Sequence, residues 1–438
     1  PILQDLLSGW MLMGLYDEVN ANRIFDKIAQ VKGMEQFANF HRALAQLSIG
    51  ELDQAEKTFS LIHTDQRNPT RRSIIYHTKI LLSLGKFQEA QDLLEKWFGP
   101  TFDPEIEEIF AYASSGKLYS ESSFPNPSSA VAEVFYSIAK LISKEVDPAF
   151  TLIYSRLAQY LDLNHADSTL MTADLLVDLA QYNLAIKEYE KLSKSQPQIY
   201  ASELGRAEAL RVSGKVMEAI EVLIELTRQY PNSANGFRTL GNHYRRLEVY
   251  DKAEVSYGEA IKLYTAKGDA DWFLYYVRGI TRERLDIWEL AEKDFRKALS
   301  LNPNQPQVLN YLGYSLIEKN SNLEEALDMI ERAVKASPDS GYIVDSLGWG
   351  YYKLGRYKKA LPNLERAAEL MPIDPIINDH LGDVYWMVGR KTEAEFQWRR
   401  ALSFDPEEED VDRIKKKLKV GLTQVLMEES KEAGSLVK

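Results

Sequence analysis

The chain has 438 residues, of which 45% are hydrophobic and 27% are charged, so its composition is that of a folded protein and not of a disordered one. Its formal net charge of -12 disfavours a protein that grips nucleic acid through phosphates, and the absence of cysteine excludes disulfides, thiolate metal sites and cysteine nucleophiles. No apolar run approaches the length that spans a bilayer. The chain starts at Pro1, so we expect a fragment or a processed form whose targeting segment lies outside this sequence.

Residues 1–120 show an eroded repeat of helical hairpins. A glycine, an alanine and two apolar residues recur at an offset of 35, first as Gly50, Ala55, Phe59 and Ile62 and then as Gly85, Ala90, Leu94 and Trp97. Residues 10–28 indicate a further hairpin ahead of them. Its apolar Trp10, Met11 and Met13 exceed what one hairpin can bury, which suggests that something upstream packed on it.

The pattern breaks between residues 100 and 129, where serine, glycine and proline accumulate and apolar residues are few. We interpret residues 121–130 as an irregular joint between two superhelical segments. A degenerate helical pair is predicted over residues 131–166.

From residue 167 to residue 406 the repeat becomes regular. One copy, at Leu347, Gly348, Tyr351, Ala360, Ala367 and Pro372, returns at an offset of 34 as Leu381, Gly382, Tyr385, Ala394, Ala401 and Pro406. Five weaker copies precede these two, around Gly313, Gly279, Gly241, Ala207 and Ala173. Seven units with leucine-glycine, tyrosine, alanine and proline at fixed places match the tetratricopeptide repeat signature.

Each unit is expected to be a pair of antiparallel helices that must stack on its neighbours to bury its apolar stripe. Gly348 and Gly382 would let the first helix of a pair lie close to the second. Gly355 and Gly389 fall between the two helices, where a positive φ is often needed. The predicted fold class is therefore all-α, an α-α superhelix of stacked antiparallel helix pairs.

Residues 407–438 are interpreted as a C-terminal capping helix and tail. Acidic residues at 407–410 precede basic residues at 413–419, as the helix dipole favours. Asp405 and Pro406 would start this helix with an N-cap acceptor and a proline at the first helical position, as Asp374 and Pro375 do one repeat earlier. A solvating cap for the last repeat is the preferred interpretation.

Sequence signatures of catalysis and of cofactor or metal binding are missing. There is no glycine-rich phosphate loop and no His-Glu-x-x-His, and the six histidines are scattered. His380 stands beside Asp379 and Asp383, but no second histidine is spaced to complete a metal-ligand set. We therefore expect no enzyme activity, no cofactor and no metal.

First-helix positions that face the concave side of such repeats carry a row of aromatic and acidic side chains. They are Asn310, Tyr311, Tyr314, Tyr342, Asp345, Trp349, Tyr352, Asp379, Asp383 and Trp386. Surfaces that anchor partners are enriched in tyrosine and tryptophan, so we predict a groove that binds a peptide or protein. The alternative for any single aromatic is packing between neighbouring first helices.

A polar and basic stretch of the same groove is predicted farther back, at Arg238, Asn242 and Arg245. The charge of the groove would then change sign along its length and could orient a partner. A merely solvated face explains the same residues equally well.

The chain is identified as a member of the tetratricopeptide repeat family over about residues 167–406. The runs VLNYLGYSL, GYIVDSLGWGYYKLGRY and INDHLGDVYWMVGR resemble those of bacterial, notably alphaproteobacterial, envelope repeat proteins. Some similar proteins are periplasmic lipoproteins that act as adaptors for cell-wall hydrolases and a C-terminal processing protease. The resemblance implies scaffolding in the periplasm, with membrane attachment only through an N-terminal anchor missing from this sequence.

The predicted function is a non-catalytic scaffold or adaptor that binds proteins or peptides in its concave groove and does not bind nucleic acid. One alternative is a cytoplasmic assembly factor that self-associates into a homo-oligomer through its terminal repeats. The other is an enzyme with a site around Asp379, His380 and Asp383.

Overall fold

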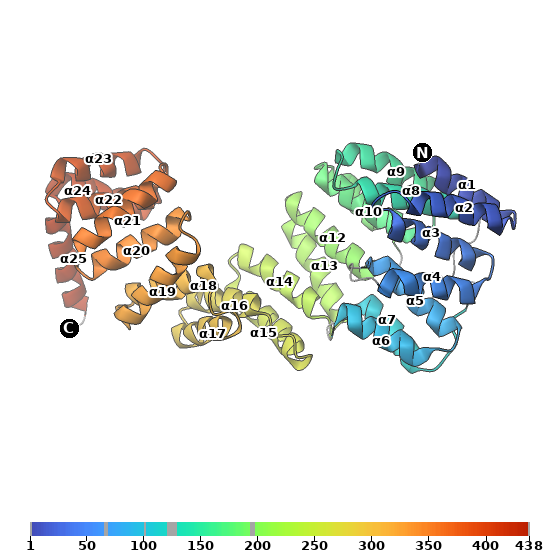
Figure 1. Ribbon diagram of the computed structural model, residues 1–438. Coiled ribbons are helices and arrows are strands. Elements are labelled where there is room, and N and C mark those ends of the chain that lie inside the picture. Colours follow the sequence, from blue (N-terminus) through green and yellow to red (C-terminus); the bar gives the residue numbers. More distant parts are fainter. Residues whose placement is uncertain (1, 65–68, 100–101, 121–128, 193–197, 437–438) are drawn as a thin grey trace. The chain divides into compact units, whose positions relative to one another are not determined.

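The computed structural model describes residues 2–64, 69–99, 102–120, 129–192 and 198–436, and in these ranges the chain forms 25 α-helices and no strand. The predicted all-α fold class is confirmed. The chain divides into two compact units, Pro1–Ala270 and Asp271–Lys438, and each unit is described by itself (Figure 1).

The first unit contains helices α1 to α15, most of them in antiparallel pairs such as α3 with α4 and α12 with α13. Their bounds are α1 Ile2–Gly14, α2 Glu18–Ala29, α3 Glu35–Ser48, α4 Leu52–Thr64, α5 Arg71–Ser83, α6 Phe87–Phe98, α7 Pro104–Ser114, α8 Ala130–Ile142, α9 Pro148–Leu161, α10 Ala166–Asp178, α11 Tyr182–Tyr189, α12 Ile199–Val212, α13 Val216–Gln229, α14 Ala234–Arg246 and α15 Tyr250–Ala266.

Helix α8 returns to pack against α1, and the two helices lie side by side in Figure 1. Trp10 and Met13 are buried in one cluster with Ala130 and Val134 of α8, while Met11 is exposed. The expectation that Trp10 and Met13 need an upstream partner is therefore wrong, because a helix more than a hundred residues downstream covers them. Sequence periodicity could not show this contact, since it lies outside the local repeat.

The second unit contains helices α16 to α25, with four antiparallel pairs followed by two C-terminal helices. Their bounds are α16 Trp272–Arg284, α17 Trp288–Leu301, α18 Pro306–Glu318, α19 Leu323–Ala336, α20 Gly341–Lys353, α21 Tyr357–Leu370, α22 Pro375–Met387, α23 Lys391–Leu402, α24 Glu408–Val420 and α25 Leu422–Leu436.

The signature glycines hold the helices of each pair together, as predicted. A Cβ added at Gly348 would lie 2.5 Å from Cγ of Leu364, and one added at Gly382 would lie 2.5 Å from Cδ1 of Trp398. Between the helices, Gly355 has a φ of 69°, a left-handed conformation that a residue with a Cβ adopts only under strain. The glycines are thus required by close approach in the first helix and by backbone conformation in the turn.

The C-terminal segment differs from its prediction. It forms two helices and not one, with a break at Gly421, whose φ is 83°. Asp374 caps α22 as expected, since its carboxylate accepts from the Ile377 N–H at 3.0 Å. Asp405 does not repeat this role: its φ is 54°, and α24 begins only at Glu408.

The predicted joint at residues 121–130 lies mostly outside the described residues, which resume at Ser129, immediately before α8. Residues 104–114, in the part of 1–120 where the repeat pattern is already broken, form α7. Asp103 caps α7 by accepting from the N–H groups of Glu105 and Ile106.

Candidate functional site

The second unit carries a pocket of about 690 Å³, bordered chiefly by α16, α18, α20 and α22, the first helices of four successive pairs. We call it the second-unit groove and define it by its lining residues: Glu283, Arg284, Asp286, Asn310, Tyr311, Tyr314, Ser315, Glu318, Lys319, Tyr342, Asp345, Ser346, Asp374, Ile376, Ile377 and His380. Five predicted groove residues are brought together here, namely Asn310, Tyr311, Tyr314, Tyr342 and Asp345.

Asn310 is the polar residue of the groove whose hydrogen bonding is incomplete. It is 8% exposed, and its side-chain oxygen Oδ1 has no hydrogen-bond partner within the described part of the chain. Leaving a buried acceptor unpaired costs about 1–3 kcal/mol. Because Asn310 lines the groove, a donor from a bound chain could supply the missing hydrogen bond.

Tyr311 and Ser315 hold the carboxylate of Glu283 at the edge of the groove. The Tyr311 hydroxyl donates to one oxygen of Glu283 at 2.6 Å, and the Ser315 hydroxyl donates to the other at 2.8 Å. Burial raises the pKa of Tyr311, and the neighbouring Glu283 carboxylate raises it further. Tyr311 therefore acts as a neutral donor that fixes a negative charge in place.

Tyr314 and Tyr342 supply aromatic surface to the groove. Tyr342 is 49% exposed, so about half of its surface is available for contact. Burial raises the pKa of Tyr314, with Glu318 and Asp345 adding to the effect, and its hydroxyl makes no hydrogen bond within the described residues. Both tyrosines can therefore contact a ligand without first giving up an internal bond.

Trp349 and Tyr352 do not line the groove but form a buried stack beside it, with exposures of 7% and 9%. The Trp349 ring lies 3.8 Å from the His380 ring and 4.6 Å from that of Tyr352, and its Nε1 donates to Glu318 at 2.8 Å. His380 Nδ1 donates to both oxygens of Asp345 at 3.0 and 3.1 Å. Burial alone would lower the pKa of His380, but the Asp345 carboxylate outweighs it and raises that pKa.

Asp379, Asp383 and Trp386 contact the C-terminal helices of their own chain. Nζ of Lys417 in α24 lies 2.7 Å from a carboxylate oxygen of Asp379 and 2.7 Å from one of Asp383. Trp386 Nε1 donates to the hydroxyl of Thr423 in α25 at 3.0 Å. These three predicted groove residues are thus engaged internally, and for the two aspartates the basic run at 413–419 was the sequence signal that could have shown it.

Arg238, Asn242 and Arg245 lie on α14, in the first unit and not in the unit that carries the other ten predicted residues. Arg238 donates to Asn235 at 2.7 Å, while the hydroxyl of Tyr257 donates to Asn242 at 2.8 Å and accepts from Arg245 at 3.2 Å. The three polar residues are therefore part of a hydrogen-bonded helix surface within the first unit.

The residues around His380 are arranged as ion pairs. His380 binds Asp345, whereas Asp379 and Asp383 bind Lys417, so these neighbours in sequence do not converge on one site. Within the described ranges, no group of three or more histidine, aspartate or glutamate side chains is placed to hold a metal ion. In the same ranges no helix has both the length and the apolar character needed to cross a bilayer.

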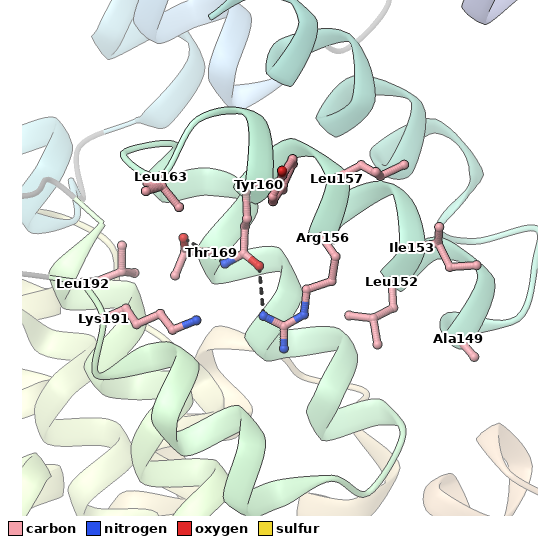
Figure 2. Close-up of a pocket in the computed structure, with 11 residues that line it drawn as sticks. Ala149, Leu152, Ile153, Arg156, Leu157, Tyr160, Leu163, Thr169, Lys191 and Leu192 are labelled. Atoms are coloured by element: carbon pink, nitrogen blue, oxygen red, sulfur yellow. Dashed lines mark hydrogen bonds between the residues drawn. The ribbon is translucent and has the colours of Figure 1, made fainter.

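A further surface that sequence analysis missed lies on α9. A pocket of about 730 Å³ runs along α9 and reaches α10 and the residues that follow α11 (Figure 2). The buried residues of α9 are small, Thr151, Ser155 and Ala158, whereas Ile153 is 53% exposed and Tyr160 81% exposed. The apolar spacing of α9 was visible in the sequence, but periodicity alone could not tell which face is inside.

Stacked antiparallel helix pairs that meet through glycine and alanine define a helical-repeat scaffold, in which each pair buries its apolar stripe against its neighbours. A family model described as tetratricopeptide repeat matches residues 170–406, which is more than half of the chain, and the chain belongs to that family. Proteins of this kind bind protein or peptide partners on extended concave surfaces.

Among curated proteins, the chain is similar to the TPR repeat-containing protein PA4667 of Pseudomonas aeruginosa, with 29% identity over 193 residues, covering 41% of this chain and 32% of that protein. It is also similar to the lipoprotein NlpI homolog of Haemophilus influenzae, with 38% identity over 87 residues, covering 19% of this chain and 26% of that protein. The chain thus spans about a third or less of the length of these relatives.

Among solved structures, the chain is similar to a tetratricopeptide repeat protein from Parabacteroides merdae. The two are 17% identical, the match covers 59% of this chain and 98% of that one, and the TM-score is 0.46.

Proposed function

We propose that this chain is a non-catalytic scaffold that holds a segment of a partner protein in the second-unit groove. The observation that carries the proposal is Asn310, a buried groove residue whose Oδ1 lacks a donor. A backbone N–H of an extended peptide is a donor that every partner segment can provide. Its binding would remove the cost of the unpaired acceptor, so the groove gains stability when it is occupied.

The charges of the groove select the kind of segment. Five carboxylates line it, from Glu283, Asp286, Glu318, Asp345 and Asp374, against the two cations Arg284 and Lys319 and the imidazole of His380. Complementary potentials steer association and suppress wrong partners. The proposed ligand is therefore a segment with lysine or arginine side chains, whose apolar groups contact Tyr314 and Tyr342.

The proposed setting is the bacterial periplasm, with the chain acting as an adaptor for a C-terminal processing protease or a cell-wall hydrolase. Support comes from the sequence runs that resemble envelope repeat proteins and from the similarity to a curated lipoprotein of Haemophilus influenzae. Attachment to a membrane would require an anchor outside the present sequence.

The test is affinity capture from envelope and soluble fractions with the wild-type chain and with Asn310→Leu, followed by identification of the captured proteins. Capture of an envelope protease or hydrolase by the wild type, with loss in the variant, is the expected result. Capture of such an enzyme equally by both chains would reject the groove, and capture of soluble-fraction proteins alone would reject the envelope setting.

A further inference from the structure

A third pocket, of about 840 Å³, lies entirely within the first unit and has a different chemistry. Its walls include residues from α3, α5, α8, α10, α12 and α14, so it runs along several successive helix pairs. We call it the first-unit pocket. An elongated pocket that touches so many helices fits a stretch of polypeptide better than a single small ion.

One face of α5 provides two of its cations and a tyrosine ring. Arg72, Tyr76 and Lys79 are spaced four and three residues apart and so share one side of the helix. The Arg72 guanidinium pairs with Glu133 at 2.5 Å and with Asp167, and it also lies over the Tyr136 ring at 4.8 Å. Arg72 is thus held in one orientation by groups from two other helices.

The pocket's carboxylates are already compensated by arginine. Asp103 and Glu105 pair with Arg71 at 2.6 and 2.8 Å, and Asp167 pairs with Arg72. Lys79 and Lys140 also line the pocket, but neither has a carboxylate oxygen within 4.0 Å in the described part of the chain. Lys79 and Lys140 are therefore the two cations of the pocket wall that make no ion pair within the described residues.

Two buried donors in the pocket also lack acceptors. Gln36 Nε2 and Arg72 Nε have no hydrogen-bond partner within the described residues, and both residues line the pocket. Unpaired buried donors are costly, so an acceptor brought by a ligand would be favoured. The pocket therefore combines leftover cations with unpaired donors, and both features call for an acceptor-rich, negatively charged ligand.

We propose that the first-unit pocket binds an acidic peptide segment. Its carboxylates pair with Lys79 and Lys140, and its carbonyl oxygens accept from Gln36 and Arg72. The rings of Phe37 and Phe40, on the adjacent face of α3, contact its apolar side chains. The site is separate from the second-unit groove and does not depend on the function proposed for that groove.

A nucleic acid fits the pocket less well than a peptide does. The arginines of its wall are already paired with carboxylates, and the chain has a formal net charge of -12, so a continuous phosphate backbone would find few unpaired cations there. A peptide can place single carboxylates beside the two lysines and keep uncharged groups beside Asp103 and Asp167.

The test measures anisotropy of a short fluorescent peptide of glutamate, leucine and serine, with a matched peptide that carries glutamine in place of glutamate. We expect the acidic peptide to bind the full chain and the glutamine peptide to bind about tenfold or more weakly. The combined Lys79→Gln and Lys140→Gln variant should bind the acidic peptide more weakly than the wild type by about the same factor. Added salt should lower the affinity of the wild type for the acidic peptide more than it lowers that of the variant.

Two variants serve as controls. Lys187→Gln changes an exposed lysine of the first unit that does not line the pocket, and it should keep wild-type affinity. Gln36→Met removes an unpaired donor without emptying its space, so it should weaken peptide binding while the melting temperature stays the same or rises. This second variant separates loss of binding from loss of folding.

The proposal would be overturned by equal binding of the two peptides, by undiminished affinity in the double lysine variant, or by displacement of the peptide by a single-stranded oligonucleotide of higher affinity. Asn310→Leu should bind the acidic peptide as the wild type does. Loss of acidic-peptide binding in that variant would place the peptide in the second unit and would likewise reject the first-unit pocket.

Discussion

Lys417 and Asp383 form an ion pair in which neither side chain is exposed to solvent, with 2.7 Å between Nζ and the carboxylate. The Trp398 indole N–H donates to the same carboxylate oxygen at 2.9 Å. The pair joins α24 to α22 and places the C-terminal helices on residues that the repeat pattern assigns to the concave surface. The C-terminal segment is therefore a packed part of the second unit and not only a solvating cap.

Replacing Lys417 with methionine should lower the free energy of unfolding of the second unit by about 3–5 kcal/mol. Removal of one partner of a buried ion pair leaves an uncompensated buried charge. The measurement is urea-induced unfolding monitored by tryptophan fluorescence. Lys419→Met, a change at an exposed lysine of the same helix, should stay within about 0.5 kcal/mol of the wild type. Equal, small effects for both variants would show that the pair does not hold α24 in place.

Gly382→Ala should destabilise the second unit by about 1–3 kcal/mol, because the added Cβ meets the fully buried Trp398 at 2.5 Å. Gly236 in α14 is the matched control, since its nearest neighbour beyond its own helix would lie at 3.4 Å. Gly236→Ala should be neutral or stabilising by up to about 1 kcal/mol, as alanine is the better helix former. Thermal unfolding measures the stability of the two variants. A Gly382→Ala variant more stable than Gly236→Ala would refute the role of close helix approach at Gly382.

The first unit should lose stability as the pH falls below neutral. Burial lowers the pKa of His63 to about 3 and that of His77 to about 4, and the Nδ1 atoms of the two rings lie 2.8 Å apart. A lowered folded-state pKa means that the unfolded chain binds protons first. Stability is therefore complete above the ordinary pKa of 6.5 and declines as the pH falls from there toward 4.

The expected slope is about 1.4 kcal/mol per pH unit for each histidine within that window. Hydrogen exchange of α5 amides across the window measures it, and His77→Gln should make the dependence shallower. An unchanged slope in this variant would show that His77 does not titrate with unfolding.

His380 should act in the opposite direction in the second unit. Its folded-state pKa is raised by Asp345, so the stability that this pair contributes is complete below the ordinary pKa of 6.5 and is lost as the pH rises through the raised value. Hydrogen exchange of α22 in the wild type and in His380→Gln should converge at high pH. A difference that stays constant across neutral pH would contradict a titrating His380 and Asp345 pair.

The helix pairs of residues 167–406 were predictable because their spacing reflects a packing requirement that recurs in every unit. Gly348 and Gly382 face large side chains at 2.5 Å, so the sequence keeps the same small residue at the same place. The division after Ala270 had one weak signal, the four extra residues between the repeat of Gly241 and that of Gly279. An insertion alone does not indicate whether it lengthens a helix or marks the boundary between two compact units.

The candidate sites were only partly predictable, because several of their contacts join residues far apart in the sequence. Tyr311 and Tyr342 follow from repeat positions, but the engagement of Asp379 by Lys417 depends on how the C-terminal helices fold back. In the first-unit pocket, Arg72 meets Glu133 and Asp167, 61 and 95 residues away. No repeat spacing encodes such contacts.

The most direct test of the second-unit groove compares Asn310→Leu with Asn378→Leu in binding and in stability. Asn378 is also a buried asparagine of a first helix, and its Oδ1 likewise lacks a partner within the described residues. It lies outside the groove, however, and its Nδ2 donates to the carbonyls of Asp374 and Pro372 at 2.6 and 3.2 Å, two bonds that leucine would remove. Asn378→Leu should therefore lower the free energy of unfolding by about 1–3 kcal/mol. Asn310→Leu should leave stability unchanged or raised, because it replaces an unpaired acceptor by an apolar group.

Binding is measured with a fluorescent peptide of lysine, leucine and serine. We expect Asn310→Leu to weaken binding of this peptide about tenfold while the stability of the chain is undiminished, because one hydrogen bond of about 1.4 kcal/mol is lost. Wild-type affinity in Asn310→Leu, or a loss of stability equal to that of Asn378→Leu, would contradict the claim that Asn310 is held unpaired for a ligand.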